Sequence, residues 1–84
     1  MNKKELEPVL DTGLTPAEAA HQIFVESPYH PLRRLKCRYA EGELTIAGRV
    51  PSYFLKQLAQ NVVKQLDGVE RIRNIIEVSE LSPL

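Results

Sequence analysis

Residues 42–54 read GELTIAGRVPSYF, a strand pattern that runs directly into the start of a helix. In its first half, apolar side chains alternate with the others, which is the period of a strand with one buried face. Pro51 cannot continue the hydrogen-bond ladder of a sheet, and Ser52 is a favourable N-cap. The stretch therefore predicts a strand that is followed at once by a helix.

Gly48 stands on the apolar side of this strand pattern. A glycine inside a strand weakens it and is typical of a point where another segment approaches the backbone closely. We expect that segment to be a helix, packed over the inward-facing position where Gly48 has no side chain.

The residues before this stretch predict the other strand of a β-hairpin. The apolar residues Leu35, Cys37 and Tyr39 stand at every second position, and a turn at Glu41-Gly42 follows them. The two strands then share one apolar face.

A first helix is predicted from a capping box, in which Thr15 is the N-cap, Pro16 the first helical residue and Glu18 the acid three positions after the cap. The residues of its apolar face are Ala17, Ala20, Ile23 and Phe24. The helix should end at SPYHP, residues 27–31, a link made stiff by its two prolines.

A second helix and a third strand complete the pattern. The apolar stripe of the helix consists of Leu55, Leu58, Ala59, Val62 and Leu66, and Gly68 is expected to cap its C-terminus. The inward residues of the strand are Ile72, Asn74, Ile76 and Val78.

These elements predict an α+β fold in the order α-β-β-α-β. Both helices must cover the apolar face of a three-stranded mixed sheet, because only one sheet face is apolar. A right-handed connection through the second helix makes the second and third strands parallel, and leaves open whether they are neighbours. We expect one domain at residues 14–79, with flexible tails at 1–13 and 80–84.

Composition adds little about function. The 84-residue chain has 11 basic and 11 acidic residues, so its total charge predicts no partner. Cys37 is the only cysteine, which excludes an intrachain disulfide and fits a reducing compartment. The N-terminal residues lack the apolar stretch of a signal peptide, and no segment is apolar enough to span a bilayer. We therefore expect a cytoplasmic location.

Two glycine-containing motifs resemble those of the BON domain, a family named for bacterial osmotically induced and nodulation-associated proteins. The first, V-x-L-x-G-x-V and a small polar residue after a turn glycine, is matched by Gly42, Leu44, Ile46, Gly48, Val50 and Ser52. The second, G-V-x-x-V-x-N-x-L-x-V, is matched by Gly68, Val69, Ile72, Asn74, Ile76 and Val78. The resemblance implies a non-enzymatic binding module, often in the bacterial envelope, that associates with phospholipid surfaces or with envelope proteins.

Groups suited to catalysis or metal binding are few. Cys37 is expected on the buried side of its strand as a small core residue, the alternative being a catalytic thiol. His21 and His30 have no further ligand at metal-binding spacing. We expect no catalytic residue, no metal and no cofactor.

The outward positions of the predicted strands are strongly basic. Six of these positions are basic and one is acidic; the ten are Arg34, Lys36, Arg38, Thr45, Ala47, Arg49, Arg71, Arg73, Ile75 and Glu77. They predict an anion-facing surface, the alternative being a solvated face whose charges keep sheet edges from pairing.

The expected partner is an anionic phospholipid surface or an acidic protein. None of the outward positions is aromatic and there is no G-x-x-G loop, so nucleic acid is a weaker, purely electrostatic alternative. Protein interaction or self-association through a sheet edge, without any role for lipid, is another. Tyr53 and Phe54 are candidate interfacial aromatics; alternatively, Phe54 lies in the core and Tyr53 is a lone surface residue.

Overall fold

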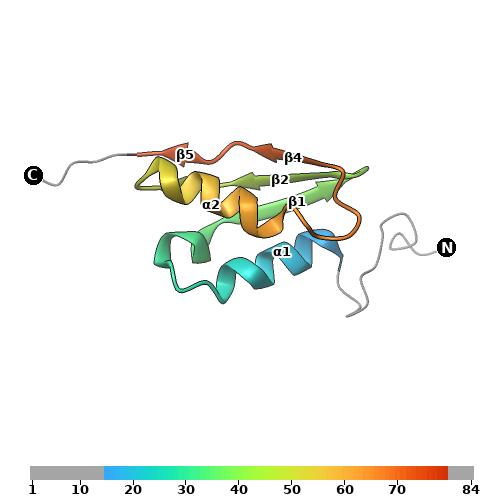
Figure 1. Cartoon of the computed structure of the whole chain (residues 1–84), viewed down its shortest axis with the longest axis horizontal. Coiled ribbons are helices and arrows are strands. Elements are labelled where there is room, and N and C mark those ends of the chain that lie inside the picture. Colours follow the sequence, from blue (N-terminus) through green and yellow to red (C-terminus); the bar gives the residue numbers. More distant parts are fainter. Residues whose placement is uncertain (1–14, 80–84) are drawn as a thin grey trace, which may run out of the picture.

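The computed structural model describes residues 15–79; the tails predicted at 1–13 and 80–84 lie outside the described residues. Its elements are α1 (Pro16–Val25), the 3₁₀ helix η2 (His30–Arg34), β1 (Lys36–Ala40), β2 (Glu43–Ala47), β3 (Arg49–Val50), α2 (Tyr53–Val63), β4 (Arg71–Asn74) and β5 (Glu77–Val78). Both α-helices lie on one side of the strands (Figure 1). This arrangement confirms the predicted α+β fold.

Three strands form a mixed sheet in the order β1-β2-β4. β1 and β2 are the antiparallel arms of the predicted hairpin, and β2 and β4 run parallel, as expected. The sequence left the neighbours of the last strand open, and the structure makes β2 the central strand.

The order of elements differs from the prediction, because the second and third strands are each divided in two. β3 and β5 form a separate parallel pair beyond a bend at Gly48. The register is kept across the bend, since Glu43 pairs with Arg71 on one side and Arg49 with Glu77 on the other. The observed order is therefore α-β-β-β-α-β-β, with η2 between α1 and β1.

As predicted, another segment approaches the backbone closely at Gly48. The prediction that this segment is a helix was wrong. A Cβ built on Gly48 would lie 2.6 Å from Cδ2 of Leu35, the residue just before β1, and no helix atom is among its nearest neighbours. Gly48 is also exposed rather than buried, and its φ of +142° is a conformation that L side chains rarely adopt. The backbone conformation therefore favours glycine at the bend, and a side chain there would also force the Leu35 side chain to shift.

The start of α1 has the predicted geometry. The Glu18 N–H donates to Thr15 Oγ1 at 3.2 Å, and the Thr15 N–H donates to Glu18 Oε1 at 3.1 Å. α1 ends at Val25, before the first proline of the link.

The link after α1 contains a helix that the sequence did not predict. η2 spans His30–Arg34, and the Leu35 N–H closes it by donating to the Leu32 carbonyl at 3.2 Å. Arg34 therefore belongs to η2, and its predicted outward position on a strand is wrong. The buried side chains of Leu32 and Leu35 fix this segment to the core.

α2 begins as predicted and ends earlier. Ser52 Oγ accepts from the Leu55 N–H at 3.2 Å, as an N-cap should. The helix ends at Val63, so Gly68 lies in the following loop and is not the C-terminal cap. Its carbonyl accepts from the Tyr39 hydroxyl at 2.7 Å, which attaches this loop to β1.

The core lies between the helices and the sheet. Its buried members are Ala20, Phe24, Leu32, Leu35, Leu44, Ile46, Val50, Leu55, Ala59, Val63 and Ile76. Val63 takes the core position that the apolar stripe had assigned to Val62, which is instead exposed.

Asn74 joins α2 to the sheet. Its Nδ2 donates to the Lys56 carbonyl at 3.1 Å and to Gln60 Oε1 at 3.2 Å, and its Oδ1 accepts from the Ile76 N–H at 3.1 Å. The inward asparagine of an otherwise apolar strand thus satisfies backbone groups on both elements.

Gly48→Val should lower the free energy of unfolding by about 2–5 kcal/mol, because overpacking against Leu35 costs roughly 1–3 kcal/mol and a strained backbone costs a similar amount. Urea unfolding measures the change. The control is Ala47→Val at the neighbouring position, which should change stability by less than about 1 kcal/mol. Equal, small losses in both variants would contradict the close approach at Gly48.

Asn74→Ala should destabilise the fold by about 1–3 kcal/mol, because it leaves the Ile76 N–H without its partner and removes the side-chain hydrogen bond to the Lys56 carbonyl of α2. Gln60→Ala removes only a side-chain acceptor and should cost about 0.5 kcal/mol. Thermal and urea unfolding of both variants give the comparison. A loss no larger for Asn74→Ala than for Gln60→Ala would show that Asn74 does not hold α2 to the sheet.

Candidate functional site

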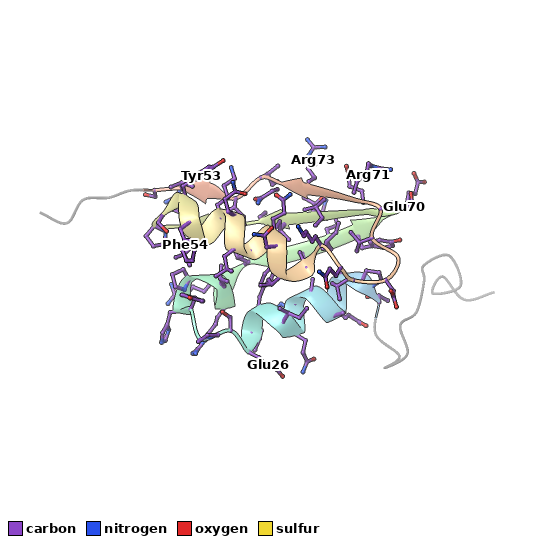
Figure 2. All side chains as sticks on the ribbon, in the orientation of Figure 1. Glu26, Tyr53, Phe54, Glu70, Arg71 and Arg73 are labelled. Atoms are coloured by element: carbon purple, nitrogen blue, oxygen red, sulfur yellow. The ribbon has the colours of Figure 1, made fainter. Side chains whose placement is uncertain are left out.

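The open face, defined as the side of the strands turned away from α1 and α2, is the candidate binding surface. The exposed basic residues on its strands are Lys36, Arg38, Arg49, Arg71 and Arg73. In Figure 2 the side chains of Arg71 and Arg73 project away from the helices. These five residues occupy the outward positions that the strand period predicted.

Strand pairing brings three of these cations together. Arg38 pairs with Thr45 across β1 and β2, and Thr45 pairs with Arg73 across β2 and β4. Arg38 and Arg73 therefore flank Thr45 in one row of the sheet, while Lys36 pairs with Ala47 in the next outward row. In the part of the chain that the structure describes, no ion pair joins Lys36, Arg38 or Arg73 to a carboxylate.

The other two strand cations have acidic neighbours. Arg49 Nη2 lies 3.1 Å from Glu77 Oε1. Arg71 lies 3.9 Å from Glu43 Oε2 and 4.0 Å from Glu70 Oε1. Glu43 is a second acid on the open face, so the prediction of a single acid there was wrong. The positive charge is concentrated at the other three residues.

A shallow hollow of about 470 Å³ marks the bend in the sheet, lined by Ala47, Gly48, Arg49, Ile75 and Glu77. Ile75 is 49% exposed within it. The predicted outward positions that lie on strands carry no aromatic side chain, so they offer a nucleic-acid base no aromatic ring on which to stack.

The candidate interfacial aromatics lie at one end of the domain. Tyr53 and Phe54, in the first turn of α2, are each 60% exposed, so Phe54 is not a core residue. The ring of Phe54 packs edge-on against Tyr29, with centroids 6.3 Å apart. Tyr29 was not predicted as part of this group. The signal that could have identified it is its place as an aromatic residue between the two prolines of the link.

A groove of about 330 Å³ between α1, α2 and the link lies beside these rings. Its lining is Ile23, Phe24, Glu26, Ser27, Pro28, Tyr29, Leu32, Leu58 and Val62. The exposed Val62 extends this apolar surface along α2.

Cys37 and His21 line a third hollow, of about 640 Å³, between α1 and β1. Cys37 is half-buried, and desolvation raises the pKa of its thiol from 9.0 to about 11. A catalytic cysteine needs the opposite shift, toward the thiolate. Among residues 15–79, no group of three or more His, Cys, Asp or Glu side chains is placed to hold a metal ion.

The bent sheet, the two helices on one face and the exposed cations on the other define a small α+β domain. The BON domain family model matches residues 17–80, most of the 84-residue chain. The chain therefore belongs to the BON domain family, whose members are non-catalytic and generally bind phospholipid.

Two further findings bear on relatives and on membranes. No curated protein matches this chain. Within the described residues, no helix has the length and apolar character that crossing a bilayer requires.

Four of the residues that match the family motifs, the three glycines and Asn74, have structural roles in this domain. Gly48 forms the bend, Asn74 fixes α2, and the Gly68 carbonyl accepts from Tyr39. The Gly42 carbonyl, in the hairpin turn, accepts from the Glu70 and Arg71 N–H groups at 2.7 and 3.0 Å.

Cys37 should react with a disulfide reagent about 100-fold more slowly in the folded protein than in urea at pH 8, because a pKa of about 11 in place of 9.0 lowers the thiolate fraction by that factor. The folded-state rate should keep rising up to about pH 11. Stopped-flow labelling across pH measures both quantities. A folded-state rate close to the unfolded one would restore a reactive-thiol interpretation.

Proposed function

We propose that this domain binds anionic phospholipid surfaces through its open face. The observation that carries the proposal is the group formed by Lys36, Arg38 and Arg73, three exposed cations in adjacent outward rows. The general phospholipid binding of the BON family supports the choice of ligand.

The spacing of the three cations suits a lipid surface. Arg38 and Arg73 are separated by one strand, so their backbones lie about 10 Å apart. This distance is comparable to the Debye length at physiological ionic strength, and both charges therefore act on the same patch of headgroups. Each basic residue near an anionic surface contributes about 1 kcal/mol, which gives modest, salt-sensitive binding.

An acidic protein partner is the second candidate, and Ile75 is the observation that favours it. An apolar side chain that is 49% exposed beside Arg49 fits the mixed composition of a protein interface. Nucleic acid has weaker support, because the open face offers cations without aromatic stacking partners.

The double variant Arg38→Gln/Arg73→Gln should weaken binding to vesicles that contain phosphatidylglycerol by about 2 kcal/mol, or about 30-fold, because it removes two charges from the open face. It should also reduce the dependence of binding on salt. Its stability should change little, since exposed charges contribute little to folding. Cosedimentation with vesicles at several salt concentrations measures the effect.

The matched control is Lys56→Gln/Lys64→Gln, which removes two charges from the α2 side of the domain and leaves the open face unchanged. This variant should bind nearly as well as the parent protein. Equal losses in both variants would mean that total charge, and not the open face, determines binding. No binding of the parent to anionic vesicles at low salt would contradict the lipid proposal and leave the protein partner.

A further inference from the structure

Three exposed aromatic rings gather at one end of the domain, although they come from two segments. Tyr29 belongs to the link between α1 and η2, while Tyr53 and Phe54 belong to the first turn of α2. The edge-on contact between Tyr29 and Phe54 holds the two segments together. Figure 2 shows Tyr53 and Phe54 at the opposite end from Glu70 and Arg71.

Basic residues lie on the elements next to these rings. η2 packs against both α2 and β3, so that cations of η2 and β3 reach the same end. The exposed cations of these two elements are Arg33, Arg34 and Arg49. Arg33 Nε donates to the Ser27 carbonyl at 2.7 Å, which fixes its guanidinium beside the link.

Two carboxylates lie near these residues, and one of them is paired with a cation. Glu77 is paired with Arg49 at 3.1 Å, so these two charges largely offset each other and the positive charge of this end comes from Arg33 and Arg34. Glu26 accepts from the neutral Gln22 amide at 3.0 Å and lines the groove beside Tyr29, while Figure 2 shows it on the side away from Tyr53 and Phe54. No ion pair involves Arg33 or Arg34 in the described part of the chain.

We infer that this aromatic end (Tyr29, Tyr53 and Phe54) inserts into the interface of an anionic bilayer while the neighbouring cations contact headgroups. The inference rests on the proposed lipid binding and adds an apolar contribution to it. Tyrosine suits the headgroup level, because its ring is apolar and its hydroxyl stays hydrated, and phenylalanine can reach the acyl boundary.

Charge favours a bilayer as the occupant over a second copy of the chain. A two-fold dimer through the aromatic end would set Arg33 and Arg34 against the same cations of the other copy. Anionic headgroups instead neutralise them, as they do for other interfacial segments that combine apolar and basic residues.

The insertion also fixes an orientation. Arg49 lies on β3, between the open face and the aromatic end, and so belongs to both surfaces. The domain would meet the membrane along the edge that these surfaces share, with its α1 side turned away. Binding would then have a salt-sensitive part from the cations and a salt-insensitive part from the rings.

The chain has no tryptophan, so a single introduced indole reports on one position without background. Phe54→Trp places the probe in the aromatic end, and the control Gln65→Trp places it at an exposed site beyond the other end of α2. Each variant is mixed with phosphatidylglycerol vesicles, with and without brominated acyl chains, and cosedimentation records binding separately. Circular dichroism checks that both variants fold.

On binding, the emission of the Phe54→Trp variant should shift to the blue and be quenched by brominated chains, while the emission of the Gln65→Trp variant should change little. Binding of the Phe54→Trp variant without either change would overturn the insertion and leave open-face binding intact. No binding of either variant or of the parent would remove the proposed function, and the inference with it. A blue shift that depends on protein concentration without vesicles would show self-association and overturn the inference.

A second pair of variants tests the apolar contribution. Tyr53→Ser/Phe54→Ser should weaken vesicle binding on the order of tenfold and abolish the part that persists at high salt. The control Val25→Ser changes a similarly exposed apolar residue on α1 and should have no effect on binding. Unchanged high-salt binding of the double variant would also overturn the insertion.

Discussion

The contact between Leu35 and the backbone of Gly48 is the constraint on which the rest of the fold depends. Leu35 is buried immediately before β1, in the space that a side chain at position 48 would need. The strand bends there, and β3 then leads directly into the N-cap of α2. One missing side chain thus allows the core to close at the point where strand becomes helix.

Much of this fold is predictable because its signals are local. The capping box at Thr15, the alternation of β2 and the N-cap at Ser52 each act within a few residues, and each is confirmed. The bend at Gly48 and the central place of β2 depend on contacts between distant segments, which periodicity does not record. η2 escaped prediction because a short 3₁₀ helix bounded by prolines has no apolar period of its own.

Parts of the candidate site were likewise predictable from local sequence, and other parts depend on tertiary contacts. Period-two alternation placed Arg38 and Arg73 on the outward face, because the side of a strand follows from the sequence alone. The ion pairs of Arg49 with Glu77 and of Arg71 with Glu43 depend on the register between parallel strands. Of these two acids, only Glu77 was predicted on the outward face. Tyr29 meets Phe54 only through the path of the link, so the aromatic end emerges from the tertiary structure.

The bend in the sheet interrupts the strands without breaking their ladder. The carbonyls of Ile46, Gly48 and Val50 accept in turn from the N–H groups of Ile75, Glu77 and Ser79, at 2.8–3.0 Å. The bend is therefore no hinge, and the two halves of the sheet form one cooperative unit. The open face and the aromatic end are held at a fixed angle, so the proposed docking of both on a membrane would order side chains but little backbone, at a correspondingly low cost in entropy.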